Sequence, residues 1–147
     1  MTNAQINWIE DMQFVARADT GHAIVMDASL EGGGFGSASS PMEVLLMGVL
    51  GCTAMDVISI LKKKRQPVEG FKIFATGERA AEHPRAYTAI HLEYVAYGEV
   101  APDALARAVQ LSEEKYCGAM ATVRGVAKIT SASRVEPAPR SSAPSAS

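Results

Sequence analysis

The feature that most constrains this sequence is a long apolar segment at residues 42–64, which has the length of a helix of about six turns. Ser39 or Ser40 can cap such a helix, and Pro41 suits its first turn. Pro67 ends it. Apolar side chains occur at nearly every position of the segment, so no polar face remains. Because a helix that is apolar all round must be covered on all sides, we expect this one to be buried in a core.

The same segment raises a membrane alternative, since Val44–Leu61 contains a single charged residue and is at the lower limit of a bilayer span. Asp56 lies near its centre and no aromatic belt flanks it, which argues against a membrane span. Small and polar residues also interrupt it, namely Gly48, Gly51, Thr53 and Ser59. The better interpretation is a central core helix wrapped by sheet, to which a second subunit could add cover.

The rest of the chain shows strand and helix patterns in separate runs. Apolar and polar residues alternate within residues 4–28, which predicts strands that form an antiparallel meander. The later elements are two strands that form a hairpin (68–79 and 87–97), a helix that opens with Pro102 (102–116), a short helix (117–123) and a last strand (126–135). The order βββ-α-ββ-α-α-β predicts the α+β fold class.

Composition changes at the C-terminus, where residues 137–147 consist of Pro, Ser and Ala with one Arg. Such a segment cannot bury enough apolar surface to offset the entropy of ordering, so we expect a disordered tail. The remaining residues, 1–136, are expected to form one domain. Within it, the Gly- and Ser-rich residues 30–40 predict a mobile loop that is either a lid or a simple connection.

Charge and cysteine content exclude several functional classes. Fourteen Lys and Arg against sixteen Asp and Glu give a net charge of -2, so the chain lacks the excess of positive charge that is typical of nucleic-acid-binding proteins. Two cysteines are too few for a disulfide-stapled secreted scaffold, and the acidic N-terminus is unlike a signal peptide, so we expect a cytoplasmic protein. The cysteines and histidines lack ligand spacing, so neither a metal site nor a cofactor is expected.

The candidate reactive groups are Cys52, inside the apolar helix, and Cys117, just past the second helix. A buried free cysteine is more often a small hydrophobe than a reagent. A reactive thiol needs a cation, a helix N-terminus or a hydrogen bond that favours its thiolate. Asp56, four residues after Cys52, would disfavour the thiolate if it faced the sulfur. The cations that could compensate are Arg17, His22, Lys115 and Arg124.

Three motifs make the sequence recognisable: SPMEVLLM at residues 40–47, GCTAMDV at 51–57 and LSEEKYC at 111–117. They resemble the OsmC/Ohr family of thiol-dependent peroxidases, particularly its YhfA-like branch, and the resemblance covers residues 6–135. It implies an OsmC-like fold, in which antiparallel sheets wrap around the long central helices of an intertwined homodimer. Such a dimer would supply the missing cover for the apolar helix.

The resemblance also implies a function, the reduction of organic hydroperoxides in defence against oxidative stress. Cys52 would be the peroxidatic thiol that becomes a sulfenic acid, and Cys117 the resolving thiol that condenses with it to a disulfide. A small thiol, a lipoyl group or a thioredoxin-like protein would then reduce the pair.

Two activating residues of the family pattern are displaced in this sequence. The hydroperoxide reductases of this family have a Glu directly after the proline of the central helix and an Arg after a glycine in the N-terminal loop. Here Met42 takes the first place, with Glu43 after it, and His22 takes the second. Glu43, His22 and Arg17 are the candidate activators. Their displacement favours an alternative function, a non-catalytic dimer of the same fold that binds a small ligand or senses oxidant.

Overall fold

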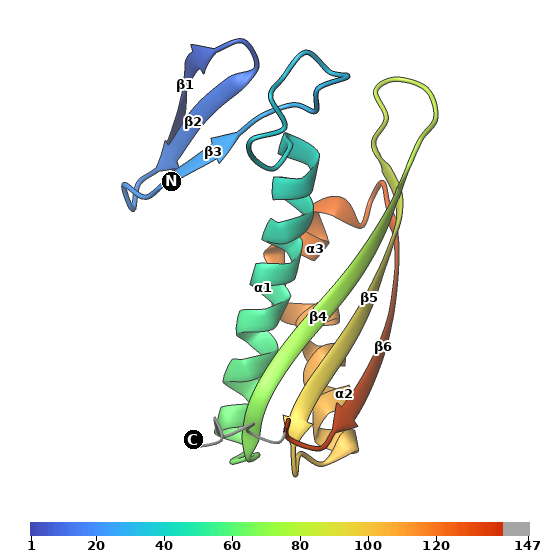
Figure 1. The fold of residues 1–147 in the computed structure, drawn as a ribbon. Coiled ribbons are helices and arrows are strands. Elements are labelled where there is room, and N and C mark those ends of the chain that lie inside the picture. The colour runs from blue at the N-terminus through green and yellow to red at the C-terminus, as the bar shows by residue number, and fades with distance from the viewer. Residues whose placement is uncertain (140–147) are drawn as a thin grey trace, which may run out of the picture. The chain divides into compact units, whose positions relative to one another are not determined.

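The computed structural model describes residues 1–139 and divides into two compact units, Met1–Met47 and Gly48–Ser147. The boundary falls within the long helix α1 (Pro41–Lys63), which can be followed with the other elements in Figure 1. The disordered tail expected at residues 137–147 lies, from residue 140 onward, outside the described residues.

The first unit contains a three-stranded antiparallel sheet. Its strands β1 (Ala4–Glu10), β2 (Gln13–Ala18) and β3 (Ala23–Met26) pair in sequence order. The meander predicted from the alternation of residues 4–28 is therefore confirmed.

The Gly-rich loop after β3 is organised around one buried carboxylate, that of Asp27, which is 2% exposed. It accepts hydrogen bonds from Ser37 Oγ at 2.6 Å and from the backbone N–H groups of Ala28, Phe35 and Ser37. The bond from Ser37 Oγ has the largest part in holding the pKa of Asp27 below its usual range. Gly34 is required here, because a Cβ would lie 2.2 Å from the carbonyl oxygen of Ala28. The loop predicted to be mobile is thus tied to the end of β3.

The second unit packs helices against a sheet of three strands in the order β4-β5-β6. The strands are β4 (Val68–Arg79), β5 (Tyr87–Gly98) and β6 (Lys128–Glu136), and the helices besides α1 are α2 (Pro102–Leu111) and α3 (Gly118–Val123). The antiparallel pairing of β4 with β5 confirms the expected hairpin. β6 runs parallel to β5, which departs from the expected antiparallel sheets. The chain between these two strands crosses over through the helices, and such a crossover permits parallel pairing.

The core of the second unit lies between this sheet and the helices beside it (Figure 1). Alternate residues of β5 point into it, as the two-residue period of a strand requires. The largest contributors, all at most 1% exposed, are Ile90, Leu92 and Tyr94 from β5, Val57 and Leu61 from α1, Leu105 from α2 and Met120 from α3.

Helix α1 buries only one stripe of its surface within the chain. The buried residues are spaced by four and are Val49, Thr53, Val57 and Leu61. Met55 is 75% exposed, and a Cβ built at Gly48 or Gly51 would meet nothing within 4 Å in the described part of the chain beyond its chain neighbours and the adjoining helix backbone. By length and composition α1 could cross a membrane, although the core helix of a soluble protein passes the same test. The cover expected on all sides of this helix is not provided by residues 1–139 alone.

Candidate active site

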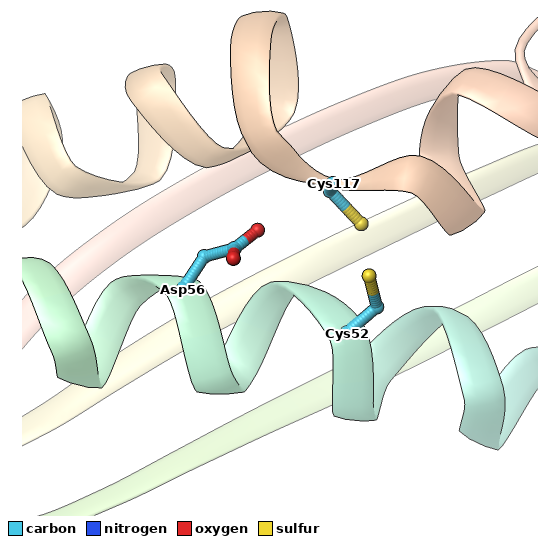
Figure 2. A group of neighbouring side chains, drawn as sticks. All are labelled: Cys52, Asp56 and Cys117. Atoms are coloured by element: carbon cyan, nitrogen blue, oxygen red, sulfur yellow. The ribbon is translucent and has the colours of Figure 1, made fainter.

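Cys52, Asp56 and Cys117 form a compact cluster in the second unit (Figure 2). Their sulfur atoms and a carboxylate oxygen all lie within 4.8 Å of one another, and both cysteines are free thiols. Cys52 and Asp56 leave the same side of α1, because residues four apart on a helix are neighbours. Cys117 points toward them from the segment between α2 and α3 (Figure 2). The structure therefore brings together two thiols that are separated by 65 positions in the sequence.

Cys117 is positioned by an unusually wide helical turn. The helix predicted to run to residue 116 is α-helical only to Leu111, and a π-helical turn, η1 (Ser112–Tyr116), follows it. The backbone N–H of Cys117 closes this turn by donating to the carbonyl oxygen of Ser112 at 2.8 Å. Cys117 itself is extended and caps α3, where its Sγ accepts from the Met120 N–H at 3.4 Å. Single π turns of this kind are frequent at functional sites.

The two thiols differ in their surroundings. Cys52 is half-buried, whereas Cys117 is 3% exposed. Burial raises the pKa of Cys117 to about 11, with further upward contributions from Cys52 and Asp56, while the Met120 N–H opposes them. Asp56 therefore disfavours the thiolate form of Cys117. At neutral pH Cys117 is a protonated thiol, and Cys52 is the more accessible sulfur of the pair.

A chain of buried hydroxyl groups runs from the cluster toward the surface. Ser112 Oγ donates to Asp56 Oδ2 at 2.9 Å and lies 2.8 Å from Thr53 Oγ1. Thr53 Oγ1 lies 2.9 Å from the Tyr94 hydroxyl, which donates to Glu113 Oε1 at 3.3 Å. Ser112, Thr53 and Tyr94, all fully buried, are called the hydroxyl chain below.

The hydroxyl chain contains one more hydrogen-bond link than its hydroxyl groups have hydrogens to donate. Burial raises the pKa of Tyr94, so this phenol keeps its hydrogen. Three hydroxyl hydrogens must serve the four links between Asp56 and Glu113. With both carboxylates ionised one link lacks a hydrogen, and a proton on either carboxyl group fills it. The arrangement can therefore hold and pass a proton between the thiol cluster and Glu113.

Removal of the Tyr94 hydroxyl is expected to destabilise the fold. Tyr94→Phe keeps the ring and its contact with Phe71 but breaks two links of the hydroxyl chain. We expect a loss of about 1–3 kcal/mol in the free energy of unfolding, measured by urea denaturation. Tyr97→Phe on the same strand is the control and should cost less than about 0.5 kcal/mol. Equal losses in the two variants would contradict a structural role for the chain.

The candidate activators Glu43, Arg17 and His22 belong to the first unit, whereas the thiol cluster belongs to the second. Glu43 caps α1: its carboxylate accepts from the Ser40 N–H at 2.7 Å, and its own N–H donates to Ser40 Oγ. These bonds lower the pKa of Glu43. The Ser-x-x-Glu spacing is a capping-box signal that could have indicated this role from the sequence. Arg17 lies on β2 opposite Gln5, and His22 is exposed in the turn before β3.

The other two cations considered for the cluster are engaged elsewhere. The Lys115 ammonium lies over the Tyr116 ring, 5.3 Å from its centroid. Arg124 Nη2 donates to the backbone oxygen of Glu113. Neither makes an ion pair with Asp56 among the described residues.

A cavity of about 410 Å³ adjoins the cluster at Asp56. Its lining combines apolar side chains with two ammonium groups, and consists of Asp56, Ser59, Ile60, Lys63, Lys64, Leu111 and Tyr116. It can admit a small molecule with an apolar body and an anionic group.

Comparisons with known proteins give consistent results. Residues 34–132 match the family model described as OsmC-like protein. The chain is 41% identical over 128 residues to protein YhfA of Escherichia coli strain K12, covering 86% of this chain and 92% of that protein. A hypothetical protein from Aquifex aeolicus VF5 is 34% identical with a TM-score of 0.83, over 95% of this chain and 98% of its own. The organic hydroperoxide resistance protein OsmC from Legionella pneumophila shares the fold at 14% identity, with a TM-score of 0.71 over 92% and 97% of the two chains.

Proposed function

Since the chain belongs to the OsmC-like protein family, as its three motifs indicated, we propose that it is a thiol-dependent peroxidase that reduces organic hydroperoxides through Cys52 and Cys117. The observation that carries this proposal is the proximity of two free thiols whose sulfur atoms lie within 4.8 Å. The name of the Legionella protein of the same fold, an organic hydroperoxide resistance protein, supports the substrate class.

The difference in exposure favours Cys52 as the peroxidatic thiol and Cys117 as the resolving thiol. In the first step the Cys52 thiolate attacks the terminal peroxide oxygen. The O–O bond breaks, the alcohol leaves after taking a proton, and Cys52 becomes a sulfenic acid. In the second step the sulfur of Cys117 attacks that of Cys52, so that an S–S bond forms and the sulfenic oxygen leaves as water.

Asp56 is the candidate general base for the second step. Cys117 must lose its proton as it attacks, and the departing oxygen must gain one to leave as water. An oxygen of the Asp56 carboxylate lies within 4.8 Å of both sulfur atoms. A rotation of the side chain or one bridging water would let it accept the first proton. The hydroxyl chain, which has room for one additional proton, keeps this carboxylate oriented and joined to Glu113.

The test is exposure of the reduced protein to one equivalent of cumene hydroperoxide, followed by mass spectrometry of non-reduced peptides. We expect a peptide pair joined by a Cys52–Cys117 disulfide, and its closure should accelerate as pH rises toward about 11, the pKa of Cys117. A product in which Cys52 is oxidised to sulfinic acid while Cys117 stays free would contradict the resolving role. Unreacted thiols would contradict the function itself.

The same proposal includes a homodimer, a cytoplasmic location and an external reductant. A second copy would cover the face of α1 that bears Met55, Gly48 and Gly51. The reductant is a small thiol, a lipoyl group or a thioredoxin-like protein, which returns two electrons and two protons to the disulfide. Arg17 and His22 remain candidates for the cation that favours the Cys52 thiolate. Glu43 instead has the role of capping the N-terminus of α1.

The cavity beside Asp56 favours a second candidate function, the binding of a small apolar ligand without turnover. Ile60, Leu111 and Tyr116 would contact the apolar body, and Lys63 and Lys64 an anionic group. Ligand affinity that is unchanged in Cys52→Ser, in a protein that does not consume peroxide, would favour this candidate over the peroxidase.

A further inference from the structure

The cluster of Cys52, Asp56 and Cys117 collects three groups that can each carry a negative charge. If both thiols ionise, three anionic ligand atoms lie within 4.8 Å and their repulsion disfavours the thiolates. The ion pairs described within residues 1–139 join Arg134 to Glu93 and Glu136, and none of them involves Asp56. Lys63 and Lys64 line the cavity beside Asp56 but form no ion pair with it among these residues.

The donor atoms of the cluster suit a thiophilic divalent cation. Cysteine thiolates and aspartate carboxylates are both ligands that Zn²⁺ binds, and sites with three protein ligands take a water molecule as the fourth. Bonds of about 2.3 Å to sulfur and about 2.1 Å to oxygen, at tetrahedral angles, place ligand atoms about 3.5–3.8 Å apart. Since these atoms already lie within 4.8 Å, small side-chain rotations complete the set. Cys52 and Asp56 also have the i, i+4 spacing with which one helix face presents two metal ligands.

The surroundings hold one of these ligands in place. Ser112 Oγ donates to Asp56 Oδ2 and so orients this carboxylate, whose other lone pairs can bind an ion. Ser112 is fully buried and is itself linked to Thr53, which makes this support rigid. The cavity of about 410 Å³ at Asp56 provides an entry path and room for the water ligand.

From this arrangement we propose that Cys52, Asp56 and Cys117 form a binding site for a thiophilic divalent cation such as Zn²⁺. Binding replaces the two thiol protons, which are released to solvent, and involves no transfer of electrons. The metal and the disulfide are alternatives, because both use the same two sulfur atoms. The site goes beyond the proposed peroxidase and does not depend on it, since binding requires only reduced thiols.

The test uses Co²⁺ as a spectroscopic probe, added without oxygen to the reduced full-length protein. We expect one Co²⁺ per chain, with a thiolate-to-cobalt charge-transfer band and the visible absorption of a tetrahedral site, and displacement by Zn²⁺. Cys52→Ser and Cys117→Ser should each weaken the charge-transfer band. Asp56→Asn, which keeps an acceptor for Ser112, should lower affinity by at least about tenfold, and Ser112→Ala by about 10- to 100-fold.

Glu114→Gln is the matched control, because it makes the same acid-to-amide change at an exposed residue of η1. It should bind Co²⁺ like the unaltered protein. Absence of the band at one equivalent, or equal affinity in Asp56→Asn and Glu114→Gln, would overturn the three-ligand site. A second measurement needs no variant: one equivalent of Zn²⁺ should protect both thiols from Ellman's reagent, and unprotected thiols would refute the proposal. No peroxide is present in either experiment, so a negative result here is distinguishable from failure of the peroxidase proposal.

Discussion

Cys52→Ser should abolish the reduction of cumene hydroperoxide, with a loss of more than about a thousandfold in kcat/KM. The serine hydroxyl keeps the size and polarity of the side chain but supplies no thiolate to attack the peroxide oxygen. Turnover is measured as peroxide consumed in the presence of an excess of dithiothreitol. Cys52 is half-buried beside Cys117 and is not one of the buried core residues, so the substitution leaves the core unaltered.

Cys117→Ser is the matched variant, since it removes a thiol from the same cluster but keeps the attacking one. Without dithiothreitol, we expect it to consume one equivalent of peroxide per chain and to accumulate a sulfenic acid at Cys52 that dimedone traps. No disulfide within the chain should form. If Cys52→Ser retained turnover while Cys117→Ser lost it, the two roles would be exchanged. If both variants retained turnover, neither thiol would be the reagent.

Met55→Glu should convert the proposed homodimer into monomers. Met55 is 75% exposed at the middle of an apolar helix, and Gly48 and Gly51 leave the same face free of side chains. A second α1 packed there would bury an unpaired carboxylate in each subunit, at a cost of about 3 kcal/mol or more per copy. Twofold symmetry applies that cost twice, so the dissociation constant should rise by more than about a thousandfold. Sedimentation equilibrium of the two proteins measures the change.

The control for this experiment is Val126→Glu, because Val126 is 70% exposed and lies in the turn after α3 rather than on α1. It should leave the association state unchanged. If Met55→Glu and Val126→Glu sediment alike, the exposed face of α1 is not the subunit interface. A protein that is monomeric before any substitution would refute the homodimer directly.

The elements that could be predicted from the sequence are those with a strong periodic pattern or a strong end signal. Helix α1 was predicted almost to the residue, because its apolar run lies between Ser40-Pro41 and Pro67. The hairpin of β4 and β5 followed from the alternation of apolar residues at Ile73 and Ala75 in one strand and Ile90, Leu92 and Tyr94 in the other. Cys52 and Cys117 were found through the motifs around them, and the i, i+4 spacing of Asp56 indicated its approach to the sulfur.

Other features depend on contacts that one segment does not encode. The parallel pairing of β6 depends on the path of the whole crossover. Thr53 could have been noticed as a polar residue on a buried helix that needs a partner, but its pairing with Tyr94 and Ser112 joins three separate elements. The order of the Gly-rich loop comes from Asp27, which precedes it and whose burial the sequence does not reveal. The family resemblance points to Glu43 as an activator, whereas its Ser-x-x-Glu spacing after Ser40 is the pattern of a helix cap.

The π-helical turn at Ser112–Tyr116 makes the number of residues before Cys117 as important as their identity. Deleting one residue from this turn would restore ordinary helical geometry and rotate every later side chain by about 100°. Such a deletion would leave both cysteines in place in any aligned set of sequences, yet turn the Cys117 sulfur away from Cys52. When relatives are compared, a gap within this turn should therefore be taken as loss of the paired site, even where both cysteines are retained.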